Sequence, residues 1–235
     1  MKVLVLFIAM VCAIACTTTE TILDFNLVEG SINKLDSAYV IFQEQAYRFP
    51  LDAQGKGTLK MNIKEDGFAI LVYGKLSTNI YLKQGNTLKV IWDKEDWRGG
   101  KMQVVSDDGG INEYIRLNIE KSFKKATECS FTLEEDSFMD KVEQTIRELS
   151  AGIDSTNFAP EIKDILKASS KYEVLYWIYK YPRFHNFGKR MSQEEYLAFK
   201  RFNEYMFDKF EAHPEYLCLT AYREYAVNWF YELMQ

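Results

Sequence analysis

Residues 106–114 read SDDGGINEY and mark the point where the pattern of the chain changes. Before this stretch, short runs rich in Val, Ile, Tyr and Phe alternate with polar residues, which is typical of strands. After it, apolar residues recur at helical spacing. Residues 106–110 therefore predict a short joint between a β unit (residues 22–107) and a helical unit (residues 108–235), which is an α+β organisation.

The β unit is expected to contain six to eight short strands. Turn signals at residues 52–57, 66–67 and 85–86 separate the runs. Strands at this spacing favour an antiparallel β-sandwich or a partly open barrel. The runs that carry the prediction are residues 24–29, 38–44, 57–64, 67–75, 79–84 and 86–93.

The helical unit is expected to contain about five helices, with residues 181–188 as a loop. Two capping boxes and two first-turn prolines mark helix starts. The boxes are Thr132 with Glu135 and Ser192 with Glu195, and the prolines are Pro160 and Pro214. The predicted helices span residues 110–124, 133–151, 160–181, 191–211 and 214–233.

Residues 1–15 have the features of an export signal. Lys2 and the free amine supply positive charge, and residues 3–15 are unbroken apolar. As a helix this stretch would span about 20 Å, short of the roughly 30 Å hydrocarbon core of a bilayer. The sequence therefore predicts a signal peptide rather than a membrane-spanning helix.

The residues Ala13, Ile14, Ala15 and Cys16 resemble the lipobox of bacterial lipoproteins. The resemblance implies cleavage before Cys16, lipid on its thiol and a membrane as partner, with residues 16–21 as a tether. It implies a cell-envelope location on the periplasmic face or the cell surface, and Thr17 favours the outer membrane because it is not the Asp that retains such proteins at the inner one. The alternative is an ordinary secretory signal that leaves Cys16 unmodified.

Two cysteines, Cys129 and Cys218, remain after removal of Cys12 with the signal and modification of Cys16. Because the chain has no Cys-x-x-Cys, the sequence excludes a thioredoxin-type active site and a cysteine zinc site within it. Cys129 and Cys218 form either one disulfide or two small buried apolar side chains.

The β unit resembles the N-terminal domain of unknown function of thioredoxin-family lipoproteins of the TlpA/ResA-like thiol-disulfide oxidoreductase type. The stretches that carry the resemblance are residues 25–30, 51–55, 80–90 and 109–114. In that family a helical region and then a thioredoxin domain follow. The resemblance implies location and architecture. It implies no redox activity, because the chain lacks the Cys-x-x-Cys that performs this activity in the family.

Other candidate chemistry has a simpler interpretation. His185 and His213, the only histidines, have no metal ligands or catalytic partners at i+3 or i+4. Asp107 and Asp108 lack the alternating ligands of a calcium loop, and we expect a turn that places acidic residues at the start of a helix. The net charge of −5 comes without a basic block, which argues against nucleic acid as a partner.

Aromatic residues are dense in the last third of the chain, and helical spacing makes core packing their default role. Any that stay exposed would form a contact surface for a protein partner or a thioredoxin domain. The candidates are Trp177, Tyr181 and Trp229.

No catalytic, cofactor or metal site is predicted. The expected function is that of a membrane-anchored lipoprotein, a non-catalytic binding or scaffold module of the cell envelope. The alternatives are the N-terminal portion of a thiol-disulfide oxidoreductase and a glycan-binding lipoprotein.

Overall fold

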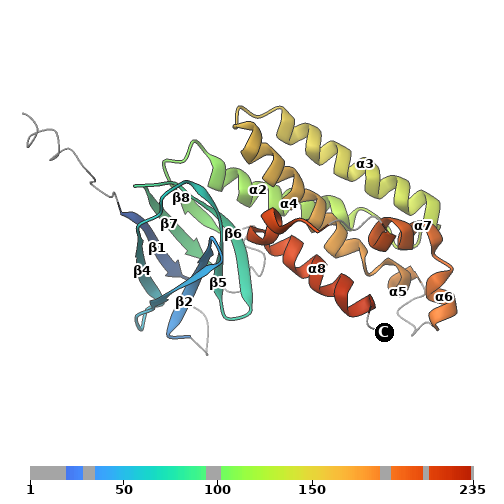
Figure 1. Cartoon of the computed structure of the whole chain (residues 1–235), viewed down its shortest axis with the longest axis horizontal. Helices are drawn as coiled ribbons and strands as arrows, with labels where there is room; N and C mark the ends of the chain where they lie inside the picture. The colour runs from blue at the N-terminus through green and yellow to red at the C-terminus, as the bar shows by residue number, and fades with distance from the viewer. Residues whose placement is uncertain (1–19, 29–34, 94–101, 186–191, 209–211, 234–235) are drawn as a thin grey trace, which may run out of the picture.

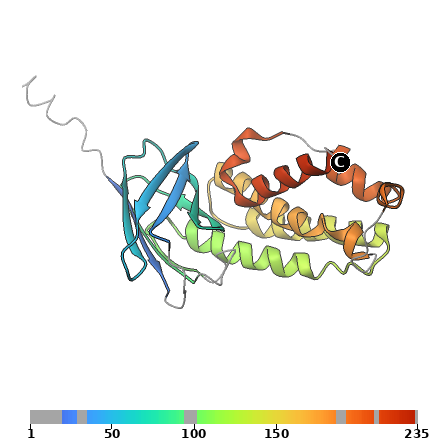
Figure 2. The ribbon, with the colours of Figure 1, turned by 90° about the horizontal axis from the view of Figure 1, so that it is seen from below.

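The computed structural model describes residues 20–28, 35–93, 102–185, 192–208 and 212–233. Figures 1 and 2 show the β unit at one end of an elongated molecule and the helical unit at the other. Cys12, Cys16 and tether residues 16–19 lie outside the described residues, so lipidation of Cys16 stays a prediction.

The β unit forms two four-stranded sheets, in the orders β4-β1-β7-β8 and β3-β2-β5-β6. This arrangement confirms the α+β class and the sandwich architecture. The strands are β1 (Thr21–Leu27), β2 (Ser37–Phe42), β3 (Gln45–Pro50), β4 (Lys56–Met61), β5 (Gly67–Tyr73), β6 (Leu76–Leu82), β7 (Thr87–Trp92) and β8 (Gln103–Val105).

One strand pair differs from the antiparallel expectation. β1 and β7 run parallel, with Leu23 opposite Leu88, whereas the other pairs are antiparallel. The chain crosses from β6, at the edge of the second sheet, to β7 inside the first, so β7 enters beside β1 in the same direction. The sandwich is therefore mixed.

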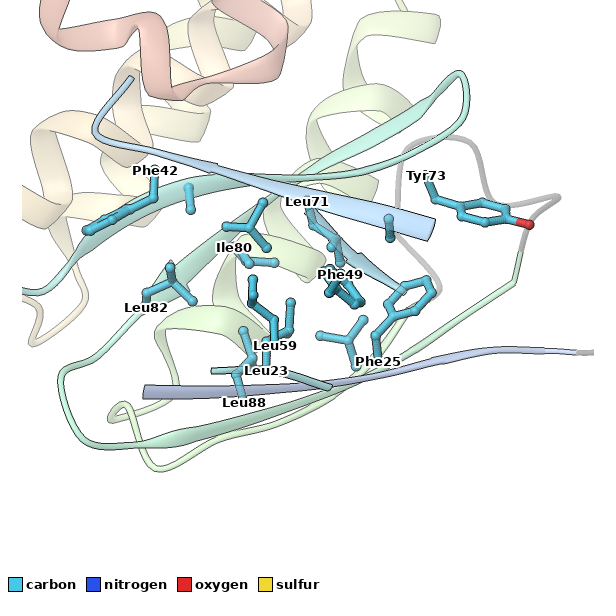
Figure 3. Close-up of a cluster of buried hydrophobic side chains, with 14 of the residues drawn as sticks. Leu23, Phe25, Phe42, Phe49, Leu59, Leu71, Tyr73, Ile80, Leu82 and Leu88 are labelled. Carbon is cyan, nitrogen blue, oxygen red and sulfur yellow. The ribbon is translucent and has the colours of Figure 1, made fainter. Parts of the chain in front are cut away.

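The core of the β unit lies between the two sheets (Figure 3). In β1 every second residue is buried, which is the two-residue period of a strand with one face in a core. Phe25 contacts Phe49 edge-to-face at 6.0 Å and Trp92 at 6.4 Å between ring centroids. Most of the remaining core is aliphatic, including Leu23, Leu59, Leu71, Ile80, Leu82 and Leu88.

The helical unit has more breaks than the sequence predicts. The predicted helix 191–211 is divided at Phe199, and its last described part is a π-helix. Pro214 begins a 3₁₀ helix, and residues 181–185 are helical where a loop was predicted. The helices are α2 (Ile111–Thr127), α3 (Glu135–Asp154), α4 (Pro160–Ile178), α5 (Tyr181–His185), α6 (Gln193–Leu197), α7 (Lys200–Asn203), η1 (Glu204–Asp208), η2 (Pro214–Cys218) and α8 (Thr220–Leu233).

The predicted helix starts are confirmed at some positions and wrong at another. Ser192 and Glu195 form both hydrogen bonds of the predicted capping box, and Pro160 is the first residue of α4. The box at Thr132 is wrong, because α3 begins at Glu135 after Glu134 and the Thr132 hydroxyl lies 2.7 Å from that of Ser130.

The turn in the opening stretch is confirmed, and Asp108 organises it. The Asp108 carboxylate is buried and accepts backbone N–H groups from Gly110 at 2.9 Å, Ile111 at 3.0 Å and Asn112 at 3.2 Å. These are donors at the start of α2 that have no partner within the helix. The backbone φ of Gly109 (+72°) and of Gly110 (+87°) lies in the region that favours glycine.

Two asparagines join the units at the edge strand β6. Tyr81 N–H donates to Asn112 Oδ1 at 2.8 Å, and Asn112 Nδ2 donates to the Tyr81 carbonyl at 2.7 Å and to the Asp108 carboxylate. From β6, Asn79 Nδ2 donates to the Cys218 carbonyl at 2.7 Å and Asn79 Oδ1 accepts Thr220 N–H at 3.1 Å. These bonds connect the two units at two places.

Candidate functional site

Three aromatic rings stack at the end of the helical unit farthest from the β unit. Phe131 lies between Trp177, at 5.8 Å and 29°, and Phe184, at 5.3 Å and 14°. Phe131 belongs to the connection between α2 and α3, Trp177 to α4 and Phe184 to α5. Residues distant in sequence therefore build one aromatic stack, in which Phe184 is 49% exposed.

The connection that carries Phe131 is held by side chains of α5. The buried Tyr181 hydroxyl donates to the Leu133 carbonyl at 2.7 Å. His185 Nδ1 lies 3.0 Å from the Phe131 carbonyl, and because a carbonyl only accepts, Nδ1 is the donor. Burial, together with the charges of Glu134 and Glu135, raises the pKa of Tyr181, so its hydroxyl stays a donor.

Three large apolar side chains at this end are exposed to solvent. They come from the α2–α3 connection, from α5 and from α6, which Figure 1 shows at the same end of the molecule. Contacts of Tyr181 link these segments, since its ring lies 6.5 Å from Phe131 and 5.4 Å from Phe199. We call this region the distal apolar surface and define it as Leu133 (36% exposed), Phe184 (49%) and Leu197 (59%).

The three predicted contact residues do not form this surface. Tyr181 is 0% exposed, so its prediction as a contact residue is wrong: its ring stacks on Phe138 at 3.9 Å in the core. Trp177 is half-buried, with Phe131 stacked on its ring and Lys180 Nζ 5.4 Å from the ring centre. Trp229 is half-buried on α8.

The two predicted disulfide partners are free thiols. Cys129 is buried, and its Sγ lies 3.8 Å from Thr145 Oγ1. Cys218 is half-buried, and its Sγ donates to the Glu215 carbonyl at 3.3 Å. Burial raises the pKa of both thiols, which favours the unreactive protonated form. Of the two alternatives from the sequence, the structure has the small apolar side chain at Cys129.

Titratable side chains converge between α7 and α3, where Arg201 contacts three carboxylates of α3 and joins the two helices by ion pairs. The three are Asp136 at 3.5 Å, Asp140 at 2.6 Å and Glu143 at 3.5 Å. His213 Nδ1 lies 2.8 Å from Glu215 Oε1, at the surface, while His185 contacts the Phe131 carbonyl. Throughout the described ranges, no three side chains of His, Cys, Asp or Glu are grouped as metal ligands. None of the helices in those ranges is both long enough and apolar enough to cross a bilayer.

The sequence did not predict the residues of the distal apolar surface, because the candidate contact residues were chosen among tryptophans and tyrosines, whereas the surface consists of two leucines and a phenylalanine. One signal was present: Leu197 follows the capping box of Ser192 and Glu195 in a stretch rich in charge, where an apolar side chain has little company on its own helix. Comparison with known proteins adds no candidate, since no family model, curated protein or solved structure matches the chain.

Proposed function

We propose that the chain is a lipid-anchored, non-catalytic binding module of the bacterial cell envelope. The observation that carries the binding role is the distal apolar surface: Leu133, Phe184 and Leu197 are exposed on three segments at one end of the helical unit, and Phe184 stacks on Phe131. Isolated apolar residues on a surface are ordinary, but several from different segments at one place are typical of a contact site. Its apolar character favours a protein partner.

The architecture supports the anchored role. Cys16, the predicted lipid attachment point, precedes β1 by only a few residues, because β1 begins at Thr21. The anchor would therefore hold the β unit near the membrane. The distal apolar surface lies at the opposite end of the molecule, where a partner has access (Figure 1).

The joint supports the same role. Asn112 and Asn79 hold the helical unit to β6 through buried or half-buried hydrogen bonds to backbone groups. Two separate attachments restrict swinging of one unit against the other. A surface on a rigid arm loses less orientational freedom when it binds.

The lipid anchor is tested by labelling cells with radioactive palmitate. We expect label in the wild type and in Cys12→Ala, and none in Cys16→Ala, which should leave the membrane fraction. Cys12→Ala is the matched control because it alters the neighbouring cysteine of the same apolar segment. Label that persists in Cys16→Ala would contradict the assignment.

A further inference from the structure

A hollow of about 330 Å³ lies on the β unit, away from the distal apolar surface. It extends over β4, β1 and β7 of the first sheet and is open to solvent, and its volume lies at the lower end of the ~300–1,000 Å³ typical of small-molecule sites. The residues that line it are Asp24, Phe25, Asn26, Lys56, Gly57, Thr58, Lys89, Val90 and Ile91.

The strand register places the outward-facing side chains in two rows. One row is Thr58, Asp24 and Lys89, and the other is Lys56, Asn26 and Ile91. Asp24, Asn26 and Ile91 are half-buried, whereas Lys56, Lys89 and Thr58 are exposed. The half-buried residues form the floor of the hollow, and the exposed ones form its rim.

The hollow carries two positive charges, from Lys56 and Lys89, against one negative charge from Asp24, which lies opposite Lys89 in the strand register. Within the described part of the protein, Lys56 and Lys89 take part in no ion pair, whereas Lys60, also on β4, contacts Glu20 at 3.1 Å. Lys56 and Lys89 lie on opposite sides of β1, so their strands are two spacings, about 10 Å, apart. Two ammonium groups therefore face a common hollow from its two sides.

The floor offers complementary chemistry. Thr58 Oγ1 donates to Asp24 Oδ1 at 2.9 Å, which holds the carboxylate in place. The second Asp24 oxygen can accept a hydrogen bond from a hydroxyl group, and the Asn26 amide can donate one and accept one. Ile91 and the methylene stems of the lysines supply apolar contact.

We infer that this hollow binds an acidic saccharide, a short sugar chain that carries carboxylates. The carboxylates pair with Lys56 and Lys89, the hydroxyls contact Asp24 and Asn26, and the C–H face of a sugar ring packs on Ile91. Two lysines against the one carboxylate of Asp24 leave the hollow with excess positive charge, so the site favours an acidic sugar over a neutral one.

The test is calorimetric titration of the full chain, in non-ionic detergent, with a trimer of galacturonic acid and with maltotriose as the neutral probe. We expect the acidic trimer to bind and maltotriose to bind at least about tenfold more weakly, since charge-assisted hydrogen bonds are the strong ones. Lys56→Gln combined with Lys89→Gln should reduce affinity for the acidic trimer by about tenfold or more. Lys60→Gln, the matched control on β4, should leave it within about twofold.

Three results would overturn the inference. They are absence of binding by the wild type, equal affinity for the two trimers, and a loss in Lys60→Gln as large as in the double variant. Binding to phosphatidylserine vesicles but not to the acidic trimer would identify the rim as a lipid contact and would also overturn it. Palmitate labelling is unaffected by these variants, so failure here is distinguishable from failure of the lipid-anchor proposal.

Discussion

The two units of the molecule fill their cores in different ways. The core of the β unit is largely aliphatic, and its strands satisfy one another's backbone groups in two hydrogen-bonded sheets. The core of the helical unit is rich in tyrosine, and several buried tyrosine hydroxyls bond to the backbone there, whereas in the β core the Tyr73 hydroxyl accepts Leu35 N–H at 3.0 Å. Tyr181 donates to the Leu133 carbonyl, and Tyr225 donates to the Met206 carbonyl at 2.7 Å.

The backbone groups that these tyrosines reach all lie where a helix is interrupted. Leu133 precedes α3, and Met206 lies in the π-helix η1. The Tyr222 hydroxyl accepts His213 N–H at 2.8 Å, just before η2. Breaks between helices leave donors and acceptors without partners, and a buried one is costly. By supplying hydrogen-bond partners to these backbone groups, the tyrosine hydroxyls stabilise the breaks between helices.

The largest predicted effect is on the helical core. Phe138→Ala removes a fully buried ring stacked on Tyr181, and should lower the free energy of unfolding by about 3–5 kcal/mol. Phe49→Ala, in the β core, should cost about 0.5–1.5 kcal/mol less, because the Phe49 ring contacts the ring of Phe25, whereas the Phe138 ring contacts those of both Tyr181 and Phe131. Urea unfolding measures both. An equal or larger loss in Phe49→Ala would contradict the contrast between the cores.

The second-largest predicted effect on stability is at the joint between the two units. Asn112→Leu keeps the volume but leaves the backbone N–H and carbonyl of Tyr81 without their partner, and should cost about 2–4 kcal/mol. Asn62→Leu, at an exposed position of the β unit, should change stability by less than about 0.5 kcal/mol.

Hydrogen exchange of the Asn112→Leu protein locates the damage. We expect faster exchange of the Tyr81 amide and of the first turn of α2, with the sheets otherwise protected. Unchanged exchange at the Tyr81 amide would show that the asparagine does not hold the joint.

The smallest predicted effects on stability distinguish the buried tyrosines of the helical unit from a partly exposed tyrosine of the β unit. Tyr181→Phe removes the donor of a half-buried carbonyl and Tyr225→Phe that of a buried one, and each should cost about 1–2 kcal/mol. Tyr39→Phe, on a partly exposed strand residue of the β unit, should cost less than about 0.5 kcal/mol. Thermal unfolding of the three variants measures the difference, and similar costs for all three would refute the proposed role of the hydroxyls.

Local signals carried most of what the sequence predicted correctly. The change from strands to helices at residues 106–114 depends on alternation, on two glycines with positive φ and on Asp108, all within one turn. The Ser192 capping box is equally local. Such features need no information about distant parts of the chain.

Features that depend on distant contacts were missed. The missed hairpin between β2 and β3, by contrast, is local. It turns on Gln43 (φ 49°) and Glu44 (φ 63°), two residue types that are rare in that conformation, so the sequence showed no turn before β3. The break at Phe199 accompanies packing of its ring on Tyr181, which is remote in sequence. The same limit applied to the site, because burial of Tyr181 and exposure of Leu197 follow from tertiary packing.

We propose that the end of the helical unit, and not the β unit, binds the protein partner. Photo-crosslinking in cells tests it directly, with p-benzoylphenylalanine in place of Phe184 and, as a matched control, in place of Val105, which is 67% exposed on β8. We predict one discrete adduct from position 184, lost when Leu197→Asp is added, and none from position 105. No adduct from position 184, an equal adduct from position 105, or an adduct that survives Leu197→Asp would contradict the account.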